Sequence, residues 1–85
     1  MQTIIACNFD ICSPTQKVYV FKEDKQEMIG EIDTLNAGKL LTGIANQYCA
    51  NKIHVIGPND FLNPIIDTIT EINFSTNNDI EIEVN

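Results

Sequence analysis

The order of hydrophobic patterns along this 85-residue chain predicts a single α/β domain. Three strand-like runs come first, followed by a helical pattern, a strand, a second helical pattern and a final strand. Strands that follow one another without a helix can pair as antiparallel hairpins, whereas parallel strands need a crossover connection. We therefore expect the series βββαβαβ over residues 1–85, with a mixed five-stranded sheet and two crossover helices.

The first three strands are predicted from short apolar and β-branched runs. Residues 3–9, T-I-I-A-C-N-F, are almost continuously apolar, which is typical of a strand buried on both faces at the centre of a sheet. A Ser-Pro turn signal follows. Residues 17–22 are β-branched and aromatic. After a polar turn, residues 27–32 form the third strand of an antiparallel meander.

The hydrophobic spacing then changes from two residues to about 3.6, which predicts a helix over residues 35–48. Its apolar stripe consists of Ala37, Leu40, Leu41, Ile44, Ala45 and Tyr48. Gly38 and Gly43 each lower helix propensity by about 1 kcal/mol relative to alanine. We expect a close approach of this helix to the sheet to explain the two glycines; a frayed first turn of the helix is the alternative.

A short strand at residues 52–56 leads to the second helical stripe, Leu62, Ile65, Ile66, Ile69 and Ile72. This helix starts either at Asn63, with Pro64 at its first position, or near Asn59, with Pro64 still in the first turn. The last strand, residues 79–84, alternates strictly between apolar side chains and carboxylates. Like charges on a terminal strand discourage edge-to-edge association.

Composition narrows the class of protein. No run approaches the ~20 apolar residues of a membrane span. The first three residues lack the basic region of a secretory signal, so we expect a cytoplasmic protein. Cys7, Cys12 and Cys49 are odd in number and match no zinc spacing, which indicates free thiols in a reducing compartment.

The charge balance argues against direct contact with nucleic acid. The net charge is −7, and the chain contains no arginine, the preferred residue for bidentate phosphate and guanine contacts. An acidic surface instead keeps a small protein soluble or favours a basic partner. The high isoleucine and asparagine content without arginine suggests an AT-rich genome, such as that of a phage or mobile element.

The element series with a central first strand resembles the ribonuclease H-like fold, whose strands lie in the order 3-2-1-4-5. The resemblance covers nearly the whole chain and rests on element order alone. Nucleases of that fold hold two divalent metals with acids in the first strand, near the first helix and at the end of the fourth strand. The resemblance implies four candidate ligands here: Asp10, Glu31 or Asp33, and Asp60.

This chain departs from the nuclease pattern in three ways. Asp10 follows its strand instead of lying within it. Asp60 is better placed to stabilise the start of a helix through the helix dipole. No basic surface is present to hold a nucleic-acid backbone. A reduced metal-dependent nuclease is therefore an alternative function and not the leading one.

Other catalytic arrangements receive little support from the sequence. His54 is the sole histidine, so any Cys–His or Ser–His catalysis must use it. Cys7 would neighbour His54 if the first and fourth strands pair, but both would then lie inside the sheet. The turn at residues 57–60 has one glycine and no lysine, which excludes a phosphate-binding loop. We expect no cofactor and no metal.

Two aromatic side chains give the clearest functional signal. Tyr19 and Phe21 project to the same face of their strand. If the helices cover one sheet face, these aromatics and Ile29 form an exposed apolar patch; if the helices cover both faces, the patch is buried. The leading prediction is a non-enzymatic interaction module that self-associates through the meander face or a sheet edge.

A third function remains open, an acidic decoy that occupies the groove of a basic nucleic-acid-binding protein. It requires five carboxylates to form one continuous face: Asp67, Glu71, Asp79, Glu81 and Glu83. Such binding would weaken sharply with salt.

Overall fold

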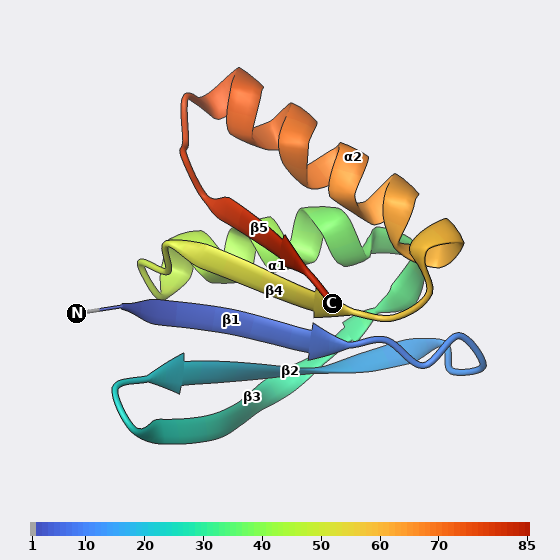
Figure 1. The fold of residues 1–85 in the computed structure, drawn as a ribbon, viewed down its shortest axis with the longest axis horizontal. Coiled ribbons are helices and arrows are strands. Elements are labelled where there is room, and N and C mark those ends of the chain that lie inside the picture. The colour runs from blue at the N-terminus through green and yellow to red at the C-terminus, as the bar shows by residue number, and fades with distance from the viewer. Residues whose placement is uncertain (1) are drawn as a thin grey trace.

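The computed structural model describes residues 2–85 and contains the predicted series of elements. In chain order they are β1 (Thr3–Asn8), β2 (Thr15–Lys22), β3 (Lys25–Asp33), the short 3-10 helix η1 (Thr34–Asn36), α1 (Ala37–Gln47), β4 (Lys52–Ile56), α2 (Asn59–Thr76) and β5 (Glu81–Val84). The strand order is β3-β2-β1-β4-β5 (Figure 1). β1 is antiparallel to β2 and parallel to β4. The α/β class, the central first strand and the order 3-2-1-4-5 are confirmed.

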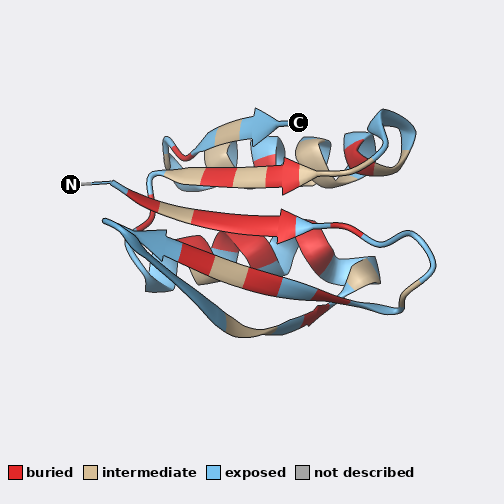
Figure 2. Cartoon of the chain, turned by 60° about the horizontal axis from the view of Figure 1, so that its bottom comes forward, coloured by how far each residue is buried: buried red, intermediate tan, exposed pale blue. Residues whose placement is uncertain are grey.

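Both helices lie on the same face of the sheet, where they pack against each other. Figure 2 shows the sheet in front and the two helices behind it. The connections from β3 through α1 to β4 and from β4 through α2 to β5 move in the same direction across the sheet. Right-handed crossovers that move in one direction place their helices on one face. Residues 2–85 therefore form two layers, and within this range no helix covers the other sheet face.

The hydrophobic core fills the space between the sheet and the helices. Strand alternation directs every second residue into it, so that Ile5 lies between its register partners Val20 and Ile53. The fully buried apolar residues are Ile5, Cys7, Val18, Leu41, Ala45, Ile53, Val55, Leu62 and Ile69. The prediction that the first strand is buried on both faces holds only in part, because Ile4 on the uncovered side is half-buried.

The crossing of the two helices depends on Gly38. A Cβ atom at this position would lie 2.8 Å from the Thr68 Cβ and 3.1 Å from the Ile65 carbonyl oxygen. The predicted close approach is therefore made to α2 and not to the sheet. A Cβ at Gly43 would meet nothing within 4 Å, so packing does not explain that glycine.

The helix ends differ in detail from the prediction. The Asp33 carboxylate accepts a hydrogen bond from the Leu35 amide at 3.1 Å and caps η1, which precedes α1. α2 starts at Asn59, so Pro64 lies in the helix interior, beyond the first turn where it was expected. Among the described residues, no helix combines the length and apolar character needed to cross a membrane.

Candidate interaction face

The sheet face opposite the helices, called the open face below, is built from the residues that alternate with the core. One row of register partners runs across all five strands: Met28, Tyr19, Ala6, His54 and Glu83. A second row comprises Gln26, Phe21, Ile4, Lys52 and Glu81. Towards the end of β1, Glu31 lies beside Lys17 and Asn8 lies beside Ile56.

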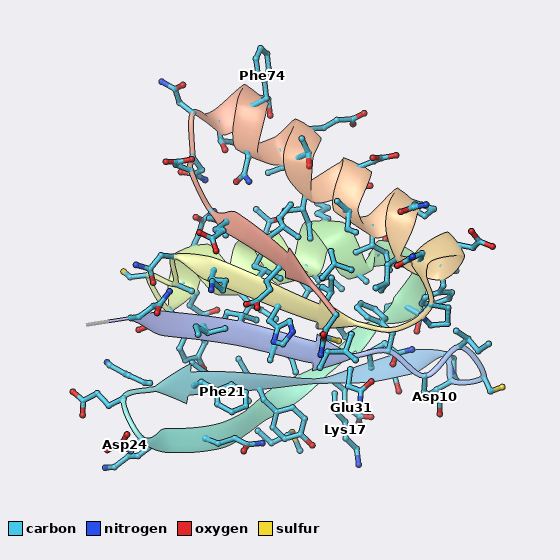
Figure 3. All side chains as sticks on the ribbon, viewed as in Figure 1. Asp10, Lys17, Phe21, Asp24, Glu31 and Phe74 are labelled. Atoms are coloured by element: carbon cyan, nitrogen blue, oxygen red, sulfur yellow. The ribbon has the colours of Figure 1, made fainter. Side chains whose placement is uncertain are left out.

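The centre of the open face is apolar and partly exposed. Phe21 is 36% exposed and Met28 is 51% exposed, while Tyr19 is half-buried. Ile4 lies beside Phe21, and Ala6 lies beside Tyr19. In Figure 3 the Phe21 ring projects from β2 on the side away from the helices. The structure thus places Tyr19 and Phe21 together on the face without helical cover, as the alternation predicts.

Ile29, the third residue predicted for this patch, lies elsewhere. The register between β2 and β3 shifts by one residue, so that Val18 pairs with Gly30 while Tyr19 pairs with Met28. Ile29 is the extra residue of this β-bulge and packs against the core. Gly30 has a φ of 154°, which favours glycine at the bulge. Met28 therefore takes the place expected for Ile29.

Charged side chains of both signs border the apolar centre. The Lys52 ammonium group contacts the carboxylates of Glu81 at 3.3 Å and Glu83 at 3.2 Å. Hydrogen bonds to Glu83 and Glu81 raise the pKa of Lys52 above its usual value. At the opposite corner, Lys17 and Glu31 are neighbours (Figure 3). The rim of the open face is therefore mixed in charge.

The sheet edges are less suited to pairing than the face. β3 forms one edge, and its bulge interrupts the regular ladder of backbone groups. β5 forms the other edge and is only four residues long. Short and bulged edges discourage strand addition. Of the two docking modes predicted from the sequence, the face has the better geometry.

The predicted metal ligands are engaged in local structure. The Asp10 carboxylate accepts a hydrogen bond from the Cys12 amide at 3.0 Å within the β1–β2 loop. Glu31 accepts one from the Thr15 hydroxyl at 3.2 Å. Besides capping η1, Asp33 accepts a hydrogen bond from the Asn36 side chain at 3.2 Å. Asp60 lies in the first turn of α2.

These acids do not converge on one point. Asp10 and Glu31 line the same hollow of about 330 Å³, whereas Asp60 lines a separate groove between the two helices. Within residues 2–85, no three His, Cys, Asp or Glu side chains are grouped closely enough to hold a metal ion. At the adjacent ends of β1 and β4 the open face carries Asn8 and Ile56, which are not carboxylates. The arrangement is a poor template for two divalent metals.

Cys7 and His54 lie on neighbouring strands but on opposite faces. Cys7 pairs in register with Val55 and points into the core, while His54 pairs with Ala6 on the open face. Burial raises the pKa of the Cys7 thiol to about 12. The His54 Nε2 atom is buried and makes no hydrogen bond to any group of residues 2–85. This geometry cannot support a Cys–His nucleophile.

The carboxylates required for an acidic decoy are divided between the two layers. Glu81 and Glu83 point to the open face, where Lys52 contacts both. Asp67 and Glu71 are exposed on α2, which covers the other face. The structure does not gather these acids into one continuous surface.

Gln16 is a buried polar residue that the sequence pattern does not single out. It is 2% exposed, and its side chain accepts a hydrogen bond from the Asp10 amide at 2.8 Å. The same side chain donates to the Asp10 carbonyl at 2.8 Å and to the Thr34 hydroxyl at 2.9 Å. Gln16 thereby fixes the β1–β2 loop to the start of η1. Gln16 lies two residues before Val18 in the same strand, and this spacing indicates that its side chain points to the buried face.

Comparison with known proteins reveals a shared fold. No protein-family model matches the sequence, and no curated protein matches it either. The structure of T. thermophilus RuvC in complex with a Holliday junction substrate is similar, with 6% sequence identity and a TM-score of 0.61. That match covers 100% of this chain and 64% of the RuvC chain.

An Aquifex aeolicus member of the Ppx/GppA family is also similar, with 8% identity and a TM-score of 0.50 over 99% of this chain and 35% of that chain. This chain therefore has the ribonuclease H-like fold and spans less than two thirds of either protein. At such low identity the likeness concerns the fold alone.

Proposed function

We propose that this domain is a small non-enzymatic interaction module that self-associates through the open face. The observation that carries the proposal is the absence of helical cover over a partly apolar surface centred on Tyr19, Phe21 and Met28. Apolar surface of this kind, bordered by polar residues, is typical of protein–protein contact sites. The setting we propose is cytoplasmic, in a phage or other mobile element.

A second copy of the chain is the partner that fits this face. Five strands about 4.8 Å apart, with about 3.3 Å per residue, give a surface of roughly 24 by 20 Å, or on the order of 500 Å² per partner. Two such faces bury about 1,000 Å², the low end for specific complexes. We therefore expect a weak, reversible dimer.

The charges at the rim of the open face also favour a second copy of the chain as the partner. The rim carries cations at Lys17 and Lys52 and anions at Glu31, Glu81 and Glu83, so a second copy can offer charges of both signs. Nucleic acid is disfavoured by the net charge of −7. A nuclease function, suggested by the Holliday junction substrate bound to RuvC, has weaker support because Asn8 and Ile56 occupy the adjacent strand ends.

Sedimentation velocity over a range of protein concentrations tests the proposal. The wild-type chain should form dimers through the open face, whereas Tyr19→Lys and Phe21→Glu should associate more weakly than the wild type, with unchanged circular dichroism, because both remove that contact. Gln47→Lys, on the exposed end of α1, is the matched control and should dimerise like the wild type. A wild-type monomer at the highest soluble concentration would refute self-association through this face.

A further inference from the structure

A second surface lies on the helical layer, away from the open face. A groove of about 590 Å³ separates η1 and the start of α1 from the first half of α2. The residues around it are Thr34, Leu35, Asn36, Ala37, Gly38, Lys39, Asp60, Phe61, Pro64, Ile65 and Thr68. The close crossing at Gly38 and Thr68 brings the two helices together along it. The groove is therefore bounded by packed helices.

Leu35 stands at this groove with its side chain almost wholly in solvent. It is 92% exposed, the largest exposure among the large apolar side chains of residues 2–85. The Asp33 carboxylate holds the Leu35 amide at 3.1 Å, which fixes the backbone of η1. Leu35, Phe61 and Ile65 all line the groove, so its lining includes apolar side chains that an incoming apolar side chain can contact.

The opposite end of α2 carries a protruding aromatic ring. Phe74 is 89% exposed in the last turn, and Figure 3 shows its ring pointing away from the body of the molecule. Helical spacing places Glu71 one turn earlier on the same outward stripe and Asp67 one turn before that. This end of α2 therefore offers a phenyl ring beside carboxylates.

We propose that Phe74 of one copy enters the groove of the next copy, with Glu71 directed towards Lys39. α2 has 18 residues, and a helix of that length is about 27 Å long. A chain therefore cannot place its own Phe74 in its own groove. The groove supplies apolar lining for the ring, and Lys39 supplies a positive charge for the neighbouring carboxylate.

Asp60 also borders the groove, at the start of α2. Its negative charge opposes an approach of Glu71 from that side. The charge arrangement therefore orients the incoming helix so that its acidic stripe lies on the α1 side of the groove, next to Lys39.

The resulting contact joins two different surfaces, so it is heterologous and builds a ring or an open chain of copies. It is separate from the dimer proposed above, because the groove and Phe74 belong to the helical layer while the open face lies on the other side of the sheet. Both contacts together would link dimers into larger assemblies.

Complementation between two defective variants tests this contact, in a Phe21→Glu background that removes the open-face dimer. The parent variant should form oligomers whose mass in sedimentation rises with concentration. Phe74→Ser retains the groove but lacks the ring, and Leu35→Glu retains the ring but has an altered groove. Each should be monomeric alone. Their mixture should form a 1:1 heterodimer at least tenfold tighter than either self-association.

Charge reversal provides a second readout in the same background. Lys39→Glu should weaken the oligomers, and the double variant Lys39→Glu with Glu71→Lys should restore them. Leu35 and Phe74 are exposed, so these variants should keep the melting temperature of the parent. A parent variant that stays monomeric, or a mixture that forms no heterodimer, would overturn the head-to-tail contact and leave the open-face proposal unaffected.

Discussion

The two faces of the sheet are made from alternating residues of the same strands, yet their surroundings differ completely. On the covered face Ile5, Val18 and Ile53 are wholly buried beneath the helices. On the open face Phe21 and Met28 remain 36% and 51% exposed. Hydrophobic stabilisation scales with apolar area removed from water, so the covered face supplies most of the folding free energy. The open face can therefore vary its apolar residues without losing the fold.

The largest contrast is expected between equivalent truncations on the two faces. Ile53→Ala should lower the free energy of unfolding by about 2–5 kcal/mol, because it leaves a cavity in the core. Phe21→Ser should cost about 1 kcal/mol or less, since the ring is already partly hydrated. Urea unfolding at a concentration where the chain is monomeric measures both. Equal losses would show that the open face also stabilises the isolated fold.

The dependence of stability on alkaline pH tests whether Cys7 is buried on the covered face. Burial raises the pKa of Cys7 from 9.0 to about 12, so the folded chain holds this proton more tightly than the unfolded chain does. Stability should therefore be intact below pH 9 and fall as the pH rises from 9 towards 12.

Unfolding curves measured across this pH range check the expectation. Cys7→Ala should reduce the loss of stability between pH 9 and 12, whereas Cys12→Ala, at an exposed position, should not. A Cys7→Ala curve parallel to that of the wild type would contradict a buried, protonated thiol.

Two glycines of α1 give a matched pair within the covered layer. Gly38→Ala should destabilise the fold by about 1 kcal/mol, because overpacking against Thr68 costs on the order of 2 kcal/mol and improved helix propensity offsets about 1 kcal/mol. Gly43→Ala meets open space and should stabilise by about 0.5–1 kcal/mol. Thermal melting curves of the two variants measure both changes, and the melting temperature should fall for Gly38→Ala and rise for Gly43→Ala. Stabilisation by both substitutions would mean that the helices can separate at no cost.

The rim of the open face should give the smallest effect. Lys52 contacts Glu81 and Glu83, but both carboxylates are largely exposed and hydrated. Lys52→Met should shift the melting temperature less than Gly43→Ala does. The shift should shrink further in high salt, because salt screens exposed ion pairs. A large, salt-independent loss would assign this cluster a role in the fold.

Much of the fold could be predicted because the change from two-residue to 3.6-residue spacing identifies both the element and its buried side. The position of both helices on one sheet face could also be predicted. Once the order 3-2-1-4-5 is given, two right-handed crossovers in the same direction place both helices on one face. The hydrophobic pattern alone does not distinguish helices on one face from helices on both faces, because it shows which residues are apolar and not which face the helices cover.

The bulge was beyond prediction, and it changed the candidate site. One extra residue in β3 exchanges Ile29 for Met28 on the open face, and simple alternation carries no mark of it apart from Gly30. The acids suggested by the fold resemblance were assigned by their order along the chain. Their separation in space depends on loop geometry, such as the Asp10 turn held by Gln16, which element order does not determine.

The Met28 methyl group reports most directly on whether the open face binds a second copy. The chain has two methionines, so its methyl resonance in an isotopically labelled sample is simple to assign by substitution. If two copies bind through the open face, the Met28 resonance shifts with protein concentration along a dimerisation curve, and Phe21→Glu abolishes the shift. A Met28 resonance that stays constant from dilute to concentrated wild-type protein would contradict self-association through this face.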